Sequence, residues 1–143
     1  MGAAQEAMRN SMSRSIWAVV AGILFAVIAT TLIDLALHAA GVFPASPTPL
    51  DDGGALLATS YRVVIGVAAA WLTARLAPSN PMKHALIAGA LGATVALIGV
   101  IATWNKNLGP HWYAIVLVVL ALPQSWLGAK LFELQGAHRV QQA

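Results

Sequence analysis

The chain has 143 residues, of which 59% are apolar and only 9% are charged. An ordinary soluble domain carries about 25% charged residues, so this chain has too few of them to cover a surface in water. A net charge of +3 would favour nucleic acid in a soluble protein, but here the basic residues lie at the ends of apolar segments. That pattern is typical of membrane proteins, and we expect lipid, not nucleic acid, around the chain. The absence of cysteine excludes disulfides, thiolate metal sites and thiol nucleophiles.

The first apolar segment covers about residues 15–43, and its uninterrupted part, 16–33, is about as long as a hydrocarbon core of ~30 Å requires. Asp34 and His38 interrupt it near its far end. A signal peptide is the alternative, because Arg9 and Arg14 precede the apolar run. The run is longer than the ~7–15 residues of a typical signal-peptide core, so we favour a membrane helix.

Prolines and glycines divide the rest of the chain into three more predicted helices. Residues 41–54 hold three prolines and two aspartates and are expected to form a loop in water. Further helices are predicted at about 55–76, 82–103 and 111–134, the last with Pro123 inside it, and a polar tail follows. Short connections favour antiparallel neighbours. The sequence therefore predicts an all-α integral membrane protein: one transmembrane domain, 1–143, with four transmembrane helices in an up-down-up-down bundle.

The distribution of Lys and Arg predicts the orientation. Six fall on one side of the predicted spans, namely Arg9, Arg14, Arg75, Lys83, Lys130 and Arg139. Two, Arg62 and Lys106, fall on the other. Because positively charged residues accumulate on the cytoplasmic side, both termini are predicted to be cytoplasmic.

Two local similarities suggest a tandem helical-hairpin repeat. Residues 17–24 resemble residues 84–91, and residues 71–76 resemble residues 126–131. A repeat in the same orientation would relate the two halves by an axis along the membrane normal. The alternative is a chance likeness between apolar helices with basic ends.

Polar residues gather where the first two helices approach their outer ends. Asp34 and His38 are four residues apart and share a helix face, and Tyr61 and Arg62 begin the third turn of the second helix. Asp34 and Arg62 lie at similar depths, roughly 10–12 Å from the helix ends, so we expect an ion pair. This pair is either a structural clamp for the first hairpin or part of a ligand site.

In the ligand-site hypothesis the ion pair lines a cavity open to the outside. The full candidate cluster is Asp34, His38, Tyr61, Arg62, Trp104, Asn105, His111, Tyr113 and Gln124. Its aromatic and polar members from the second half of the chain are expected around the mouth, and Gln124, next to the helix-breaking Pro123, at the floor.

Small residues line one face of the third predicted helix: Ala85, Gly89, Gly92, Ala96 and Gly99. Such a face lets a second helix approach closely, either within the bundle or in another protomer. We therefore expect a homo-oligomer or a larger membrane complex.

The sequence carries no HExxH, no GxSxG, no phosphate-binding glycine loop and no paired intramembrane carboxylates. These observations predict a protein that is not an enzyme and has no metal or cofactor. The alternative is His38 as a single axial ligand of a pigment.

Several short motifs support a resemblance. They are Asp34-x-x-x-His38 followed by Gly41-Val42-Phe43-Pro44, then residues 58–62, 73–78, 102–105, and Gly109-Pro110 with Trp112-Tyr113. In these motifs the chain resembles uncharacterised small four-helix bacterial membrane proteins. The resemblance implies a bacterial inner-membrane location and no particular activity.

These observations favour a non-enzymatic binding protein or accessory subunit with a polar site in the outer half of the bundle. The alternative is a small dimeric transporter that binds a polar or anionic solute at Asp34, His38 and Arg62, with a proton as a conceivable coupling ion.

Overall fold

The computed structural model describes residues 1–142 and, within them, four helices and no strand. The helices are α1 (Gly2–Ala39), α2 (Asp52–Leu76), α3 (Pro81–Thr103) and α4 (His111–Gln142). Each is long and apolar enough to cross a membrane. The chain is thus an all-helical protein with the elements of a multi-pass membrane protein, as its composition predicted.

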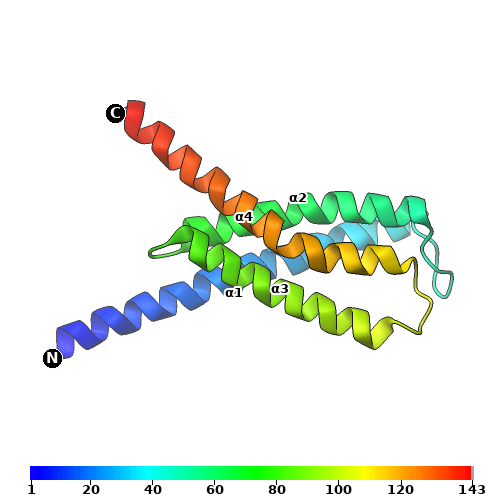
Figure 1. Cartoon of the computed structure of the whole chain (residues 1–143), viewed down its shortest axis with the longest axis horizontal. Coiled ribbons are helices and arrows are strands. Elements are labelled where there is room, and N and C mark those ends of the chain that lie inside the picture. Colours follow the sequence, from blue (N-terminus) through cyan, green and yellow to red (C-terminus); the bar gives the residue numbers. More distant parts are fainter. Residues whose placement is uncertain (143) are drawn as a thin grey trace.

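Consecutive helices run in opposite directions, so that the loops 40–51 and 104–110 lie at one end and the connection 77–80 at the other (Figure 1). We call the end with the two longer loops the outer end and the opposite end the inner end. Helices α2 and α3 each contact all three other helices, whereas α1 and α4 do not contact each other in the described chain. Helices α2 and α3 therefore form the centre of the bundle, with α1 and α4 on either side.

Local sequence explains where the helices begin. The Asp51 side chain accepts a hydrogen bond from the Gly54 backbone N–H at 2.8 Å and so caps α2. Pro81 occupies the first turn of α3, where backbone N–H groups have no partner within the helix, so the N–H that proline lacks costs no hydrogen bond. Before it, Asn80 takes a left-handed conformation (φ 43°) that reverses the chain.

The helix bounds differ from those predicted at both ends of α1, at the start of α2, which is Asp52 and not near residue 55, and at the end of α4. Helix α1 begins at Gly2, not near residue 15, and ends at Ala39, because Gly41 with φ 73° turns the chain before Pro44. Helix α4 continues to Gln142 through the predicted polar tail. The added segments are rich in Ala, Gln, Met and Arg, which are strong helix formers that extend a helix once it is nucleated.

The two long helices extend past the bundle as arms at its inner end (Figure 1). With 38 residues at ~1.5 Å each, α1 is about 57 Å long, well beyond a hydrocarbon core of ~30 Å. Helix α4, with Pro123 inside it, changes direction in its middle part (Figure 1). The apolar parts of these helices are long enough to cross a membrane, and the arms extend beyond the bundle.

The inner half of the bundle is held by glycines seated against neighbouring helices. A side chain at Gly128 of α4 would collide with the backbone carbonyl of Val67 and the methyl group of Ala70, both on α2. Beside this contact lies a core of small residues, Ala70, Ala74, Ala85 and Ala129. Small residues let the helix backbones approach closely, which is how helices associate where lipid removes the usual hydrophobic driving force.

Two buried hydroxyl residues complete this packing. Thr73 of α2, with no exposed surface, lies directly against Gly22 of α1. Ser125 of α4 lies in the same way against Gly89 of α3. Both hydroxyl groups donate to the carbonyl four residues earlier in their own helix, at 3.0 Å and 2.7 Å, so neither is left unsatisfied.

The small-residue face of α3 divides between two environments. Ala85 and Gly89 are buried inside the bundle. Gly92 and Gly99 have no atom within 4 Å of the position that a side chain would take. Only the inner part of this face is therefore used for packing within the chain.

Candidate functional site

The polar cluster is built on one ion pair between α1 and α2. Arg62 donates from Nη2 to Asp34 Oδ2 at 2.5 Å, and the Tyr61 hydroxyl donates to Asp34 Oδ1. Both carboxylate oxygens are thus engaged. The ion pair expected from the sequence is confirmed.

The pair lies at a partly open position, with side chains that are 30% (Arg62) and 29% (Asp34) exposed. Exposed ion pairs contribute roughly 0–1 kcal/mol, whereas removing one partner of a buried pair costs about 3–5 kcal/mol. Its contribution to stability therefore lies between these limits. A residual cost remains, because Arg62 Nε is buried without a hydrogen-bond partner.

A cavity of about 320 Å³ lies at the outer end over this pair. We call it the outer cavity. Its walls come from α1, α2, α4 and both outer loops: Asp34, His38, Phe43, Pro44, Ser46, Pro47, Thr48, Leu50, Ala58, Tyr61, Arg62, Lys106, Leu108 and Tyr113. The volume is at the lower end of the ~300–1,000 Å³ range of small-molecule sites.

The two outer loops are joined to each other around this cavity. The Leu50 backbone N–H donates to the Leu108 carbonyl at 2.9 Å. Beside the loops, Trp112 Nε1 in the first turn of α4 donates to Asp52 Oδ1 at the start of α2, at 2.7 Å. Phe43 is buried and meets the His38 ring edge-on at 5.4 Å between centroids. The proline-rich loop is thereby folded back over the helix ends and does not trail into solvent.

The structure separates the predicted site residues into three groups. Asp34, His38, Tyr61, Arg62 and Tyr113 line the outer cavity. Trp104, Asn105 and His111 are exposed and do not line it. The His111 ring instead lies 4.3 Å from the Trp104 ring, with Nε2 at 3.1 Å from the Trp104 carbonyl oxygen. Gln124 belongs to a second cavity.

Sequence reasoning missed Lys106 and the loop residues 43–50 as parts of the wall. Lys106 carried a usable signal, since it is a single cation in a short polar turn between two apolar segments. The loop carried none, because its path over the cavity depends on the contact between Leu50 and Leu108.

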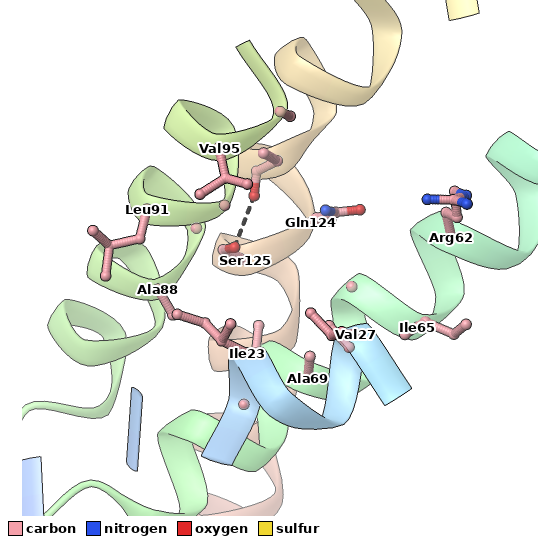
Figure 2. Close-up of a pocket in the computed structure, with 18 of the residues that line it drawn as sticks. Ile23, Val27, Arg62, Ile65, Ala69, Ala88, Leu91, Val95, Gln124 and Ser125 are labelled. Atoms are coloured by element: carbon pink, nitrogen blue, oxygen red, sulfur yellow. Dashed lines mark hydrogen bonds between the residues drawn. The ribbon is translucent and has the colours of Figure 1, made fainter. Parts of the chain in front are cut away.

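The second cavity has a volume of about 350 Å³ and lies among all four helices in the middle of the bundle (Figure 2). We call it the central cavity. Its walls are mainly apolar, with Ile23, Val27, Ile65, Leu91 and Val95 among them. In Figure 2, Arg62 and Gln124 face each other across it.

Arg62 is the one described residue that lines both cavities. Arg62 therefore separates the polar outer cavity from the apolar central cavity. The Gln124 side chain occupies the position that a side chain at Gly66, one turn after Arg62, would otherwise fill. This glycine gives the Gln124 side chain room to lie against α2.

The charges around the outer cavity are unequal. One carboxylate, Asp34, faces two cations, Arg62 and Lys106, before His38 is considered. Within residues 1–142 no group of three His, Asp or Glu side chains could hold a metal ion. The electrostatics of the cavity thus favour an anion or a molecule with a negatively charged end.

The fold and this site describe a polytopic helical membrane protein with a positively charged outer cavity. No protein-family model matches the chain, and neither a curated protein nor a solved structure shows significant similarity to it.

Proposed function

We propose that this chain is a non-enzymatic integral membrane protein, a binding protein or accessory subunit, that holds a small polar or anionic ligand in the outer cavity. One observation carries the proposal: an ion pair, two tyrosines and a lysine surround a cavity of ligand size at a helix-bundle end. Ionisable groups are rare within membrane helices and usually mark function.

The hydrogen bonds of Asp34 support binding over catalysis. A general base must be free to accept a proton from its substrate. Asp34 already accepts from Tyr61 and Arg62 with both oxygens. Such a carboxylate positions its neighbours and balances charge.

We further propose a bacterial inner-membrane location with both termini in the cytoplasm, which would place the outer cavity on the periplasmic side. The arms at the inner end support this orientation, since they carry Arg9 and Arg139. The chain has no cysteine, so single cysteines report cleanly on topology. In intact cells, a membrane-impermeant thiol reagent should label Ser46→Cys and leave Ser79→Cys unlabelled; the reverse pattern would overturn the orientation.

A self-association or a larger complex belongs to the same proposal. The outer part of the small-residue face of α3, with Gly92 and Gly99, remains open in the single chain. Much of α1 is also exposed, including Leu32 and Leu35. These surfaces are available to lipid or to a neighbouring helix.

A second candidate is a small dimeric transporter of a polar or anionic solute. It is favoured by the position of Arg62, which lines both the outer and the central cavity. A carrier would need to move this side chain to pass a solute inward.

Native mass spectrometry of the protein extracted from its own membranes in mild detergent tests the proposal. We compare wild type with Tyr113→Phe and Lys106→Gln, which leave the Asp34–Arg62 pair intact, and with Lys83→Gln at the inner end as a charge-matched control. Wild type and Lys83→Gln are expected to retain a ligand or a partner subunit, and the ligand should be lost in Lys106→Gln. Retention of nothing by wild type would contradict the proposal and leave the ion pair as a structural clamp.

A further inference from the structure

Building on the proposed function, we infer that the ligand is an anionic amphiphile: its head group occupies the outer cavity and its alkyl chain runs past Arg62 into the central cavity. The observation behind this inference is the succession of two cavities of similar volume, about 320 and 350 Å³, that share Arg62 as a wall. One is polar and positively charged, and the other is mainly apolar.

The central cavity suits an alkyl chain because it opens sideways between α1 and α3. Val27, Leu91 and Val95 line it and are nevertheless 55%, 47% and 69% exposed. Their exposed surfaces border the opening. In a membrane this opening faces lipid, from which a chain can enter without crossing water.

The central cavity is also long enough along the bundle to hold an alkyl chain. Its lining on α2 extends from Arg62 to Thr73, which at ~1.5 Å per residue is about 16 Å. This is close to half of a ~30 Å hydrocarbon core. Because this lining begins at Arg62 in the outer half and ends at Thr73 in the inner half, an alkyl chain there would run past the middle of the bundle, with its head toward the outer end.

The head group is expected to be anionic because the outer cavity offers unused cationic donors. Asp34 takes only one described hydrogen bond from Arg62, through Nη2, and Arg62 Nε has no partner. Lys106 stands in the same wall and makes no described ion pair. A carboxylate or phosphate can accept from both side chains, whereas a neutral head group would leave the charge of Lys106 uncompensated.

The structure offers a substitution that blocks the alkyl-chain site without disturbing the fold. Gly92 lines the central cavity and has no atom within 4 Å of a prospective side chain, so Gly92→Leu fills open space. Gly99, on the same helix and equally open, does not line the cavity, and Gly99→Leu is its matched control. For the head group, Lys106→Gln is compared with Lys83→Gln.

The purified full chain in mild detergent is freed of co-purified lipid and then offered dodecanoate, dodecanol or phosphatidylglycerol, with native mass spectrometry as the readout. Wild type should bind dodecanoate or phosphatidylglycerol in preference to dodecanol. Gly92→Leu should weaken binding by about tenfold or more, because the chain can no longer bury its methylene groups, while Gly99→Leu binds as wild type. Lys106→Gln should weaken binding of the charged probes and not of dodecanol.

The outcomes separate the ligand source and the two proposals. Binding of dodecanoate alone identifies a free fatty-acid-like ligand, and binding of phosphatidylglycerol identifies a membrane lipid; either supports the inference. Equal binding to Gly92→Leu and wild type, or dodecanol binding as tight as dodecanoate, overturns it. If the protein from its own membranes carries a water-soluble anion that Lys106→Gln loses and Gly92→Leu keeps, the inference fails while the proposed function stands.

Discussion

The inner and outer halves of this bundle solve the problem of helix association in different ways. The inner half has no charged side chain in its core and brings backbones together through Gly22, Gly89 and Gly128. The outer half holds α1 and α2 together through Asp34 and Arg62, and its loops through hydrogen bonds. The glycine contacts of the inner half border the mainly apolar central cavity, whereas the outer cavity is lined by charged side chains. The contrast leads us to expect that the glycine contacts contribute more to stability than the ion pair does, while the head-group site that we propose lies in the outer half.

The largest expected effect is the loss of stability when the close packing of the inner half is disturbed. Gly128→Ala places a methyl group against the Val67 carbonyl and the Trp71 backbone nitrogen, neither of which can move without shifting α2. Overpacking of this kind costs typically 1–3 kcal/mol, and we expect about 3 kcal/mol because backbone atoms are involved. The free energy of unfolding can be measured by titrating the purified protein with a denaturing detergent.

Gly136→Ala is the matched control on the same helix, since nothing lies within 4 Å of its prospective side chain. It should leave stability unchanged or raise it by about 0.5 kcal/mol, because alanine is the better helix former. Equal effects of the two substitutions would show that α2 and α4 do not depend on close backbone approach.

The next effect tests the outer half. Arg62→Met removes the cation and leaves Asp34 with Tyr61 alone, so we expect a loss of about 2 kcal/mol, between the values for exposed and buried pairs. The double variant Asp34→Leu, Arg62→Met should recover at least half of this loss, because no unpaired charge remains. Lys130→Met, which breaks an exposed pair with Glu133 at 3.8 Å, should cost less than ~0.5 kcal/mol.

If the double variant loses as much unfolding free energy as the two single variants lose together, this account of the pair is contradicted. A double variant that is stable but has lost its ligand would show that the pair serves binding more than folding.

The helical class was predictable because apolar runs, prolines and glycines mark spans and loops directly in the sequence. The Asp34–Arg62 pair was also predictable, since an unpaired charge in a membrane helix is costly and each side chain had one partner at its depth. The chain arms at Gly2–Ser15 and Gln135–Gln142 were not, because polar residues with good helix propensity give no amphipathic signal of their own.

The shape of the site was less predictable than its chemistry. His111 and Trp104 bear the residue types of a cavity mouth, yet their mutual contact holds them outside it. Gln124 lies against α2 because Gly66 leaves room for its side chain. Such contacts depend on how helices are rotated about their axes, which span lengths and charges do not determine.

A smaller effect separates side-chain from backbone contributions within the inner half. A methyl group at Gly22 would meet the Thr73 hydroxyl first and the Ala69 carbonyl, at 3.0 Å, second. Gly22→Ala should therefore lower the free energy of unfolding by about 1.5 kcal/mol. Adding Thr73→Ala should restore part of this loss, so that the two substitutions have a coupling energy of about 1 kcal/mol. Gly2→Ala, in the exposed arm of α1, is the control. Strict additivity would mean that the backbone contact alone fixes the distance between α1 and α2.

The smallest effect concerns the loops over the outer cavity. Trp112→Phe removes the hydrogen bond to Asp52 and should lower global stability by only about 0.5 kcal/mol, because this contact is exposed. Its effect on local opening should be clearer: hydrogen exchange at the Leu50 amide, which donates to Leu108, should accelerate several-fold. Trp17→Phe, at an exposed position on α1 far from both loops, should leave that amide unchanged. If exchange at Leu50 does not respond, the loops are ordered independently of α4, and entry of a ligand to the outer cavity would require movement of the helices instead of opening of the loops.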